Sequence, residues 1–415
     1  MALEGIKQGA NLWFGLNRGA WLKLGARTSI DETNLYYIES IGVRVGVFAD
    51  DTLVGFKNEH RSQYLRLKSE YAKIIKIGSS DTISPALRFT GVQIERDRQR
   101  RLLTIHQERY IEQLGEQYKE KIFPQETPYG SSKEARLNFD KLLENKESKP
   151  VDKGEYLQLM GKLVWPSACT RPDISGYISV LCSRVSDPRE CHYQAGLVVI
   201  GYLVSTKRLG ITYGGEIRVP YGLSKIPVGF VESNGLYTAH DSSWGTRPSP
   251  LGGYVIMYNN GAIDWSAKLV KIVPDSSCEA ETAVGSIAAK GTCFIRALVR
   301  FHRRPVAAST PMLGDNVAMH TNITQEGATA RTRYYERATQ LIKRAVLMLI
   351  LDPYLVSTHY MLADIFTKAV EKSTFVRLRN TMMNVHANLR IALADSGYAL
   401  HGAAARIVER MGRWL

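Results

Sequence analysis

The chain has 415 residues, of which 44% are hydrophobic and 23% are charged, the balance of an ordinary globular protein. This composition excludes a chain that is disordered throughout, and 5 cysteines without a CxxC pair indicate neither a disulfide framework nor a zinc site. Lys and Arg number 54 against 40 Asp and Glu, which gives a net charge of +14. Such a basic surplus favours a polyanionic partner such as nucleic acid, although many basic proteins bind none.

The N-terminal 126 residues mix strand and helix patterns. Five β-rich stretches predict strands that pair across short turns. They are Leu35–Glu39, Val43–Phe48, Leu53–Phe56, Leu87–Glu95 and Leu102–Ile105. The acidic pair Asp50-Asp51 falls between the second and third strands, at the tip of an expected hairpin. Helical spacing of apolar residues marks Ser62–Ile75 and Glu108–Gln117.

Residues 127–227 begin with a polar, charged segment and continue with helical patterns. Apolar residues recur at intervals of three and four in Tyr156–Val164, Tyr177–Val185 and Tyr193–Val204. We therefore expect a linker followed by a helical connection.

Residues 228–370 predict a mixed sheet with flanking helices. The expected strands are Leu236–His240, Gly253–Tyr258, Ala262–Ser266, Pro311–Gly314 and Leu355–His359. Asn259-Asn260-Gly261 is a strong hairpin signal, and a helix is expected to begin at Ser276 or Ser277. Together with the N-terminal part, this predicts a multidomain chain of the α/β and α+β classes, with a helical tail over residues 371–415.

Four single carboxylates lie at the ends of the elements expected in residues 228–370. Asp241 and Asp315 close strands, Glu281 lies in the first turns of a helix, and Asp364 opens one. Carboxylates that converge need a cation to offset their repulsion, and hard oxygen ligands suit Mg²⁺ or Mn²⁺. A pair of such ions about 4 Å apart supports phosphodiester hydrolysis. Spacing alone does not select these four, because an Asp after a strand is commonly a turn residue or a helix cap.

Several motifs select them by resemblance. They are Asp241-Ser-Ser-Trp244, Ser276-Ser-Cys-Glu-Ala-Glu281, Gly314-Asp-Asn316 and Ala363-Asp-Ile-Phe-Thr-Lys368. In this order they resemble the ribonuclease H domain of copia-type retrotransposon polyproteins. Upstream, Cys169-Thr-Arg-Pro-Asp-Ile-Ser175 resembles the connecting region of that family, and Phe48-Ala-Asp-Asp51 resembles the Y-V-D-D of its reverse transcriptase palm. The resemblance covers about residues 1–380.

The resemblance implies roles for these residues. Asp241, Glu281, Asp315 and Asp364 would bind Mg²⁺ or Mn²⁺ and cut the RNA strand of an RNA–DNA hybrid. Asp50 and Asp51 would be metal-binding carboxylates of a polymerase that uses an RNA template and a DNA primer strand. The residues expected to contact nucleic acid are Lys7, Gln8, Arg331, Arg333 and Lys368. His359 could pass a proton to the leaving group, although a plain polar residue at a strand end is the simpler interpretation.

The family places its first polymerase aspartate well before a Gly-Leu-Lys-Gln motif, whose counterpart here begins at Gly5. We therefore expect residues 1–126 to be a partial palm and thumb without fingers and without polymerase activity. Two alternatives stay open: a nucleic-acid-binding remnant without turnover, and a polymerase that a partner chain completes.

The sequence also bears on location. No uninterrupted apolar run approaches the roughly 20 residues of a spanning helix, and the N-terminus lacks a signal-peptide pattern. We therefore expect a protein that is not secreted and has no membrane partner. The cytoplasm or the nucleus is the expected compartment, and the family resemblance implies a retroelement particle if the gene is expressed.

Overall fold

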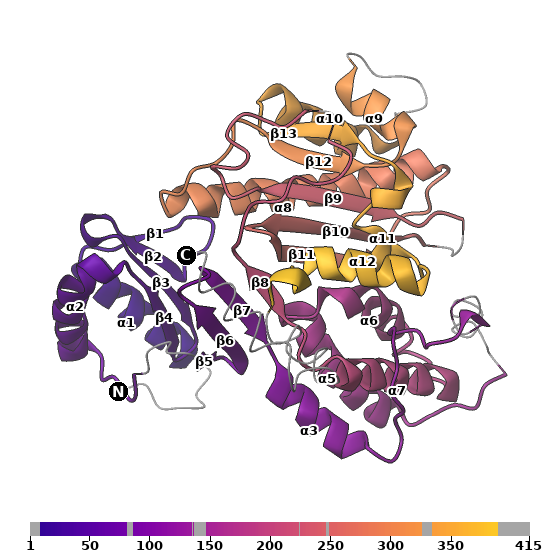
Figure 1. The fold of residues 1–415 in the computed structure, drawn as a ribbon, viewed down its shortest axis with the longest axis horizontal. Coiled ribbons are helices and arrows are strands. Elements are labelled where there is room, and N and C mark those ends of the chain that lie inside the picture. The colour runs from indigo at the N-terminus through magenta and orange to yellow at the C-terminus, as the bar shows by residue number, and fades with distance from the viewer. Residues whose placement is uncertain are drawn as a thin grey trace, which may run out of the picture.

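A computed structural model describes residues 9–80, 86–134, 136, 147–223, 225–245, 249–325 and 334–388 (Figure 1). The described strands form three sheets, in the orders β1-β2-β3-β4, β5-β6-β7-β8 and β11-β10-β9-β12-β13. The first two sheets are antiparallel, whereas the third is mixed.

The first sheet is covered by two helices at the left of Figure 1. Its elements are α1 (Gly9–Lys23), β1 (Arg27–Thr28), β2 (Leu35–Ile38), β3 (Val43–Phe48), β4 (Asp51–Gly55) and α2 (Arg61–Ile74). The rings of Trp21 in α1 and Tyr71 in α2 stack at 4.4 Å between centroids, and both side chains are buried. The three strands and the helix over residues 62–75 that the sequence predicts here are confirmed.

The second sheet joins segments that are far apart in the sequence. Its strands are β5 (Ala86–Phe89), β6 (Val92–Asp97), β7 (Leu102–His106) and β8 (Ile211–Tyr213), and α3 (Glu108–Tyr118) follows β7. The single strand expected over Leu87–Glu95 is wrong. It is two strands, because Thr90 and Gly91 adopt positive φ angles of 48° and 83° and turn the chain back on itself.

The three helices that the sequence predicts between residues 156 and 204 are confirmed. They are α5 (Lys153–Cys169), α6 (Ser175–Cys182) and α7 (Glu190–Ser205). Asp152 caps the first of them, since its side chain accepts a hydrogen bond of 2.8 Å from the Glu155 amide.

In the third sheet, the first three strands along the chain pair in antiparallel fashion. The last two strands run parallel to each other and to the first strand, β9. The strands are β9 (Tyr237–Ser242), β10 (Leu251–Tyr258), β11 (Gly261–Leu269), β12 (Thr310–Gly314) and β13 (Leu351–Leu355). The helices are α8 (Ser277–Phe301), α9 (Val317–Thr324), α10 (Glu336–Leu347), α11 (Asp364–Thr367) and α12 (Lys372–Met382). The final strand expected over Leu355–His359 is wrong. The strand ends at Leu355, and a single 3₁₀ turn over Thr358–Tyr360 follows.

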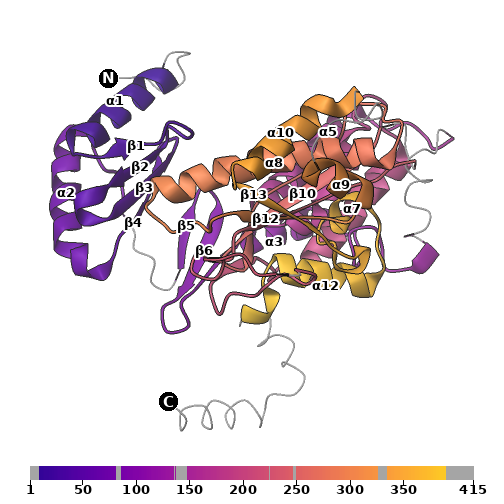
Figure 2. The same cartoon turned by 90° about the horizontal axis from the view of Figure 1, so that it is seen from above.

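Helices cover both faces of this sheet. Neighbouring residues of a strand point to opposite faces. A Cβ at Gly252 would meet Val284 of α8, whereas one at Gly253 would meet Phe366 of α11. Figure 2 shows α8 and α10 on one side of the strands and α12 on the other. α8 is the one described helix that is long and apolar enough to cross a membrane, but 56% of its most apolar window is buried. Packing against the sheet accounts for its apolar residues.

One large hydrophobic core runs from Ile111 to Val385. It takes in α3, the helices of the connection and one face of the five-stranded sheet. The connection and the five-stranded sheet therefore pack as one body in space.

Candidate metal centre

Three of the predicted carboxylates come together at one edge of the five-stranded sheet. Asp241 lies near the end of β9, Asp315 directly follows the neighbouring strand β12, and Glu281 lies in the second turn of α8. Their ligand oxygens all lie within 4.8 Å of one another, and Asp241 and Glu281 are buried. This group could hold a metal ion.

Asp364 approaches from the other face of the sheet, where it opens α11. It lies outside the group of three carboxylates, and Lys368 connects it to that group. The Lys368 Nζ lies 2.7 Å from Asp364 Oδ1 and 3.3 Å from Asp241 Oδ2. The side chain that the sequence assigns to nucleic-acid contact therefore pairs with two of the predicted catalytic acids.

Three further groups hold the carboxylates in place, and sequence reasoning missed all of them. The Ser242 amide donates to Glu281 Oε1 at 3.1 Å, and the Thr358 hydroxyl donates to Asp315 Oδ2 at 2.9 Å. The Thr367 hydroxyl donates to Asp241 Oδ2. A signal for Thr367 existed in the sequence. It follows Asp364 by three residues, a spacing that places two side chains on one side of a helix.

Burial and crowding oppose the negative charge of this cluster. Burial, followed by the charges of Asp241 and Asp315, raises the pKa of Glu281 to about 10. Burial and Asp241 likewise raise the pKa of Asp364 to about 7. Burial would lower the pKa of Lys368, but the nearby Asp241 and Asp364 outweigh it and raise that pKa above its ordinary value. Even with Lys368 in place, the negative charges of the cluster are therefore not fully compensated.

One buried oxygen of the cluster has no hydrogen-bond partner among the described residues. It is Glu281 Oε2, which is buried and lies 3.6 Å from His240 Nδ1. Burial lowers the pKa of His240 to about 4, so the imidazole is neutral near pH 7. An orphaned carboxylate oxygen beside two other carboxylates is a fitting place for a divalent cation, and oxygen ligands alone suit Mg²⁺ or Mn²⁺.

The structure places Asp50 and Asp51 away from this cluster. Asp50 lies in the turn between β3 and β4, Asp51 opens β4, and both are exposed. Asp51 Oδ2 accepts a hydrogen bond of 3.3 Å from the Thr90 amide. The predicted hairpin is confirmed. Within the described ranges, neither residue belongs to a group of three metal-ligand side chains.

The remaining predicted residues divide into two sets. Lys7, Gln8, Arg331 and Arg333 lie outside the described residues. His359 is exposed on the 3₁₀ turn that also carries Thr358, the hydrogen-bond donor to Asp315.

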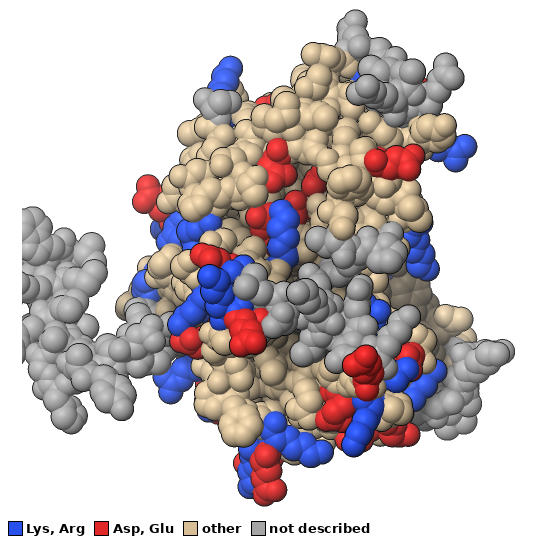
Figure 3. Space-filling model, turned by 90° about the vertical axis from the view of Figure 1, so that its right-hand side faces the viewer, with Lys and Arg blue, Asp and Glu red and all other residues tan. Residues whose placement is uncertain are grey.

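Figure 3 shows a face of the molecule on which acidic side chains surround a basic one in a hollow.

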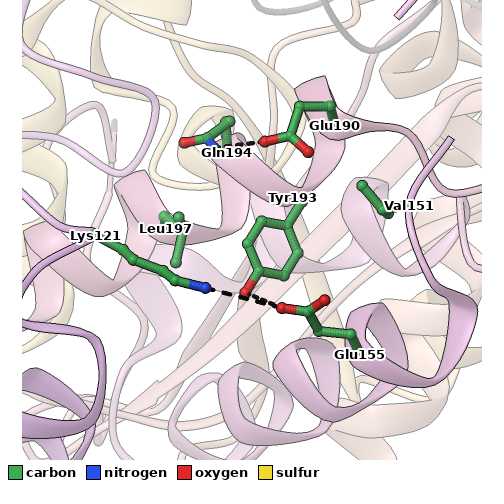
Figure 4. A pocket seen from close by; sticks show the side chains of 7 residues that line it. All are labelled: Lys121, Val151, Glu155, Glu190, Tyr193, Gln194 and Leu197. Atoms are coloured by element: carbon green, nitrogen blue, oxygen red, sulfur yellow. Dashed lines mark hydrogen bonds and ion pairs between the residues drawn. The ribbon is translucent and has the colours of Figure 1, made fainter. Parts of the chain in front are cut away.

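A cavity of about 400 Å³ lies elsewhere, beside α5 and α7 (Figure 4). The Tyr193 hydroxyl donates to Glu155 Oε1 at 2.7 Å, and Gln194 Nε2 donates to Glu190 Oε1 at 2.7 Å. The Lys121 ammonium lies 4.0 Å from Glu155 and faces the Tyr193 ring. These polar groups pair with one another, so the cavity does not indicate a particular ligand.

Comparison with known proteins finds relatives among transposon proteins. The chain is 25% identical over 403 residues to the retrovirus-related Pol polyprotein from transposon TNT 1-94 of Nicotiana tabacum. That alignment covers 93% of this chain and 28% of the polyprotein, so the chain spans little more than a quarter of its relative. It is also 25% identical over 288 residues to the transposon Ty5-1 protein YCL074W of Saccharomyces cerevisiae, covering 68% of this chain and 85% of that protein.

A shorter stretch of the chain is similar to a protein that is not named as a transposon protein. A stretch of 130 residues is 33% identical to the secreted RxLR effector protein 161 of Plasmopara viticola. It covers 80% of that protein but 30% of this chain. No protein-family model matches the chain. The relatives that align along most of its length are transposon proteins, and the chain is a distant homologue of copia-type retrotransposon Pol polyproteins.

Proposed function

We propose that this protein cleaves the RNA strand of RNA–DNA hybrids with a divalent cation held by Asp241, Glu281 and Asp315. The observation that carries the proposal is the convergence of these three carboxylates within 4.8 Å on a mixed sheet flanked by helices. Homology to Pol polyproteins supports it. The resemblance of the motifs around these acids to the ribonuclease H domain of that family also supports it.

Each carboxylate is held by a different part of the fold. The Ser242 amide fixes Glu281, and the Thr358 hydroxyl fixes Asp315. Asp241 is held by Thr367 and by Lys368, both near the end of α11. Ligands whose rotamers are fixed by such hydrogen bonds bind a cation without reorganising. A cation held there would supply Lewis-acid polarisation of the phosphodiester and of the attacking water.

The proposed partner is consistent with the charge of the chain. Its net charge of +14 favours contacts with the phosphates of a nucleic acid. Because an A-like groove hides the edges of the bases, we expect recognition by shape and 2′-hydroxyls, without sequence specificity. We propose no polymerase step for Asp50 and Asp51, since they are exposed and, in the described part of the chain, no further metal ligands join them.

The test is cleavage of a labelled RNA–DNA hybrid in Mg²⁺ by the full chain. Single-stranded RNA and duplex DNA of the same sequence serve as substrate controls. We expect cuts in the RNA strand of the hybrid alone, and we expect Asp315→Asn to abolish them. Asp352→Asn is the matched control, because Asp352 lies in the same sheet but pairs with the Tyr354 hydroxyl. It should cleave like the wild type.

Two outcomes would refute this function. Cleavage that Asp315→Asn leaves undiminished would come from another site or from a contaminant. Binding of the hybrid that weakens steeply with salt but yields no cleavage would identify a nucleic-acid-binding remnant.

A further inference from the structure

The ammonium of Lys368 lies between two carboxylates that belong to different elements. It is 2.7 Å from Asp364 Oδ1 and 3.3 Å from Asp241 Oδ2. Asp241 comes from β9, whereas Asp364 and Lys368 belong to α11 and its C-terminal end. The side chain of Lys368 is 40% exposed, so it reaches this position from the surface.

Asp241 therefore takes part in two positions that can hold a cation. On one side it joins Glu281 and Asp315 in the group that could hold a metal ion. On the other side it shares Lys368 with Asp364. The position between Asp241 and Asp364 is thus filled by a cation that the chain itself supplies.

This position cannot hold Lys368 and a divalent ion together. Mg²⁺ and Mn²⁺ lie about 2.1 Å from their carboxylate ligands. An ion at that distance from the oxygens of Asp241 and Asp364 would overlap an ammonium that lies 2.7 Å from one of them and 3.3 Å from the other. The ammonium would have to leave before a second divalent ion could enter.

We propose that Lys368 is a built-in cation that closes the Asp241–Asp364 position to a second divalent ion in the free protein. The free protein then binds one ion, at Asp241, Glu281 and Asp315. A second ion enters when the phosphates of a nucleic acid draw the partly exposed Lys368 side chain away from the acids. Lys368 acts here as a positioning residue. This inference rests on the metal site proposed above.

Electron paramagnetic resonance of Mn²⁺ tests the proposal, because it counts bound ions without needing turnover. We expect one Mn²⁺ per wild-type chain. Lys368→Met should bind two, and their proximity should broaden the signal through spin coupling. Lys368→Arg keeps the charge and should bind one. Lys372→Met is the matched control, because it removes a nearby lysine whose partner is Glu126, and it should also bind one.

A second measurement keeps the test independent of how the variants fold. Adding an RNA–DNA hybrid with intact 2′-hydroxyls to the wild type, and freezing the sample before the RNA is cleaved, should raise the count from one Mn²⁺ to two. Two ions on the free wild type would overturn the proposal. So would a single ion on a folded Lys368→Met, or a count that the hybrid leaves at one. No Mn²⁺ on the wild type would overturn the metal site itself.

Discussion

His240 Nδ1 lies 3.6 Å from Glu281 Oε2, and neither atom has a hydrogen-bond partner among the described residues. Both side chains are buried. The two groups respond to burial in opposite ways, since it lowers the pKa of His240 and raises that of Glu281. Without a cation, the folded protein therefore favours the uncharged form of each.

We predict that the metal-free protein loses stability as the pH rises above about 4.5. The folded chain keeps the Glu281 proton up to a pKa of about 10, whereas the unfolded chain releases it near the ordinary value of 4.5. The folded state then binds more protons, so the free energy of unfolding falls with pH across that window. Asp364 acts in the same direction up to about pH 7. Thermal unfolding in EDTA between pH 5 and 9 measures the slope.

Glu281→Gln is the diagnostic variant for this slope. It keeps the shape of the side chain but has no charge to bury, so its unfolding temperature should vary less with pH and should exceed that of the wild type at pH 9. His240 works in the opposite direction, because its folded pKa of about 4 costs stability as the pH falls below 6.5. A variant slope equal to that of the wild type would mean that Glu281 is already ionised in the fold.

We predict that Mg²⁺ stabilises the folded protein, and more at pH 8 than at pH 6. A cation at Asp241, Glu281 and Asp315 competes with the protons that the cluster otherwise holds. At a hundred times the dissociation constant, the linkage amounts to about 2.7 kcal/mol. Thermal scans with MgCl₂ and with EDTA at equal ionic strength measure it. Asp315→Asn should lose most of the effect, and a shift retained in that variant would place the ion elsewhere.

The motifs that resemble the copia-type ribonuclease H domain selected the acids of the cluster, because a position at the end of an element does not by itself distinguish them from turn residues and helix caps. Asp241 and Asp315 follow strands that turned out to be neighbours in the sheet, and the motifs identify both acids without any knowledge of side-chain geometry. The position of Lys368 was not predictable in this way. Its contact with Asp241 spans 127 residues and depends on how α11 packs across the sheet.

The errors in predicting the strands from the sequence have local physical causes. Thr90 adopts a positive φ, which a residue with a β-branched side chain seldom does, so the break between β5 and β6 was hidden. Pro353 lies inside β13 and weakened its pattern, although an edge strand tolerates proline. β8 is three residues long and pairs with β7. Its sequence is too short to show a strand pattern, so it was not predicted.

Gly176 is predicted to control the placement of α11. A Cβ at this position of α6 would lie 2.4 Å from the carbonyl oxygen of Phe366, so Gly176→Ala must push α11 away. We expect a loss of about 1–3 kcal/mol in the free energy of unfolding, together with weaker Mn²⁺ binding. Gly161→Ala is the matched control, because a Cβ there meets no heavy atom within 4 Å beyond its chain neighbours and the backbone of its own helix. It should gain about 0.5–1 kcal/mol. Denaturant titration compares the two, and equal stabilities would contradict the close approach.

The buried pair of Arg171 and Asp173 is predicted to contribute strongly to the stability of the core. Arg171 contacts both carboxylate oxygens, at 3.0 and 2.8 Å, and neither side chain is exposed. Burial would raise the pKa of Asp173, but Arg171 outweighs it and holds that pKa below its usual range. Arg171→Met leaves a buried carboxylate without its main partner, so we expect a loss of about 3–5 kcal/mol.

An exposed ion pair supplies the control for this variant. Lys207 lies 2.7 Å from Glu112 with both side chains substantially exposed, and Lys207→Met should cost no more than about 1 kcal/mol. Combining Arg171→Met with Asp173→Leu removes both buried charges and should recover part of the loss, because an apolar pair pays no desolvation penalty. Urea unfolding of the three variants measures these differences. If Arg171→Met costs as little as Lys207→Met, the pair does not hold the helical connection together.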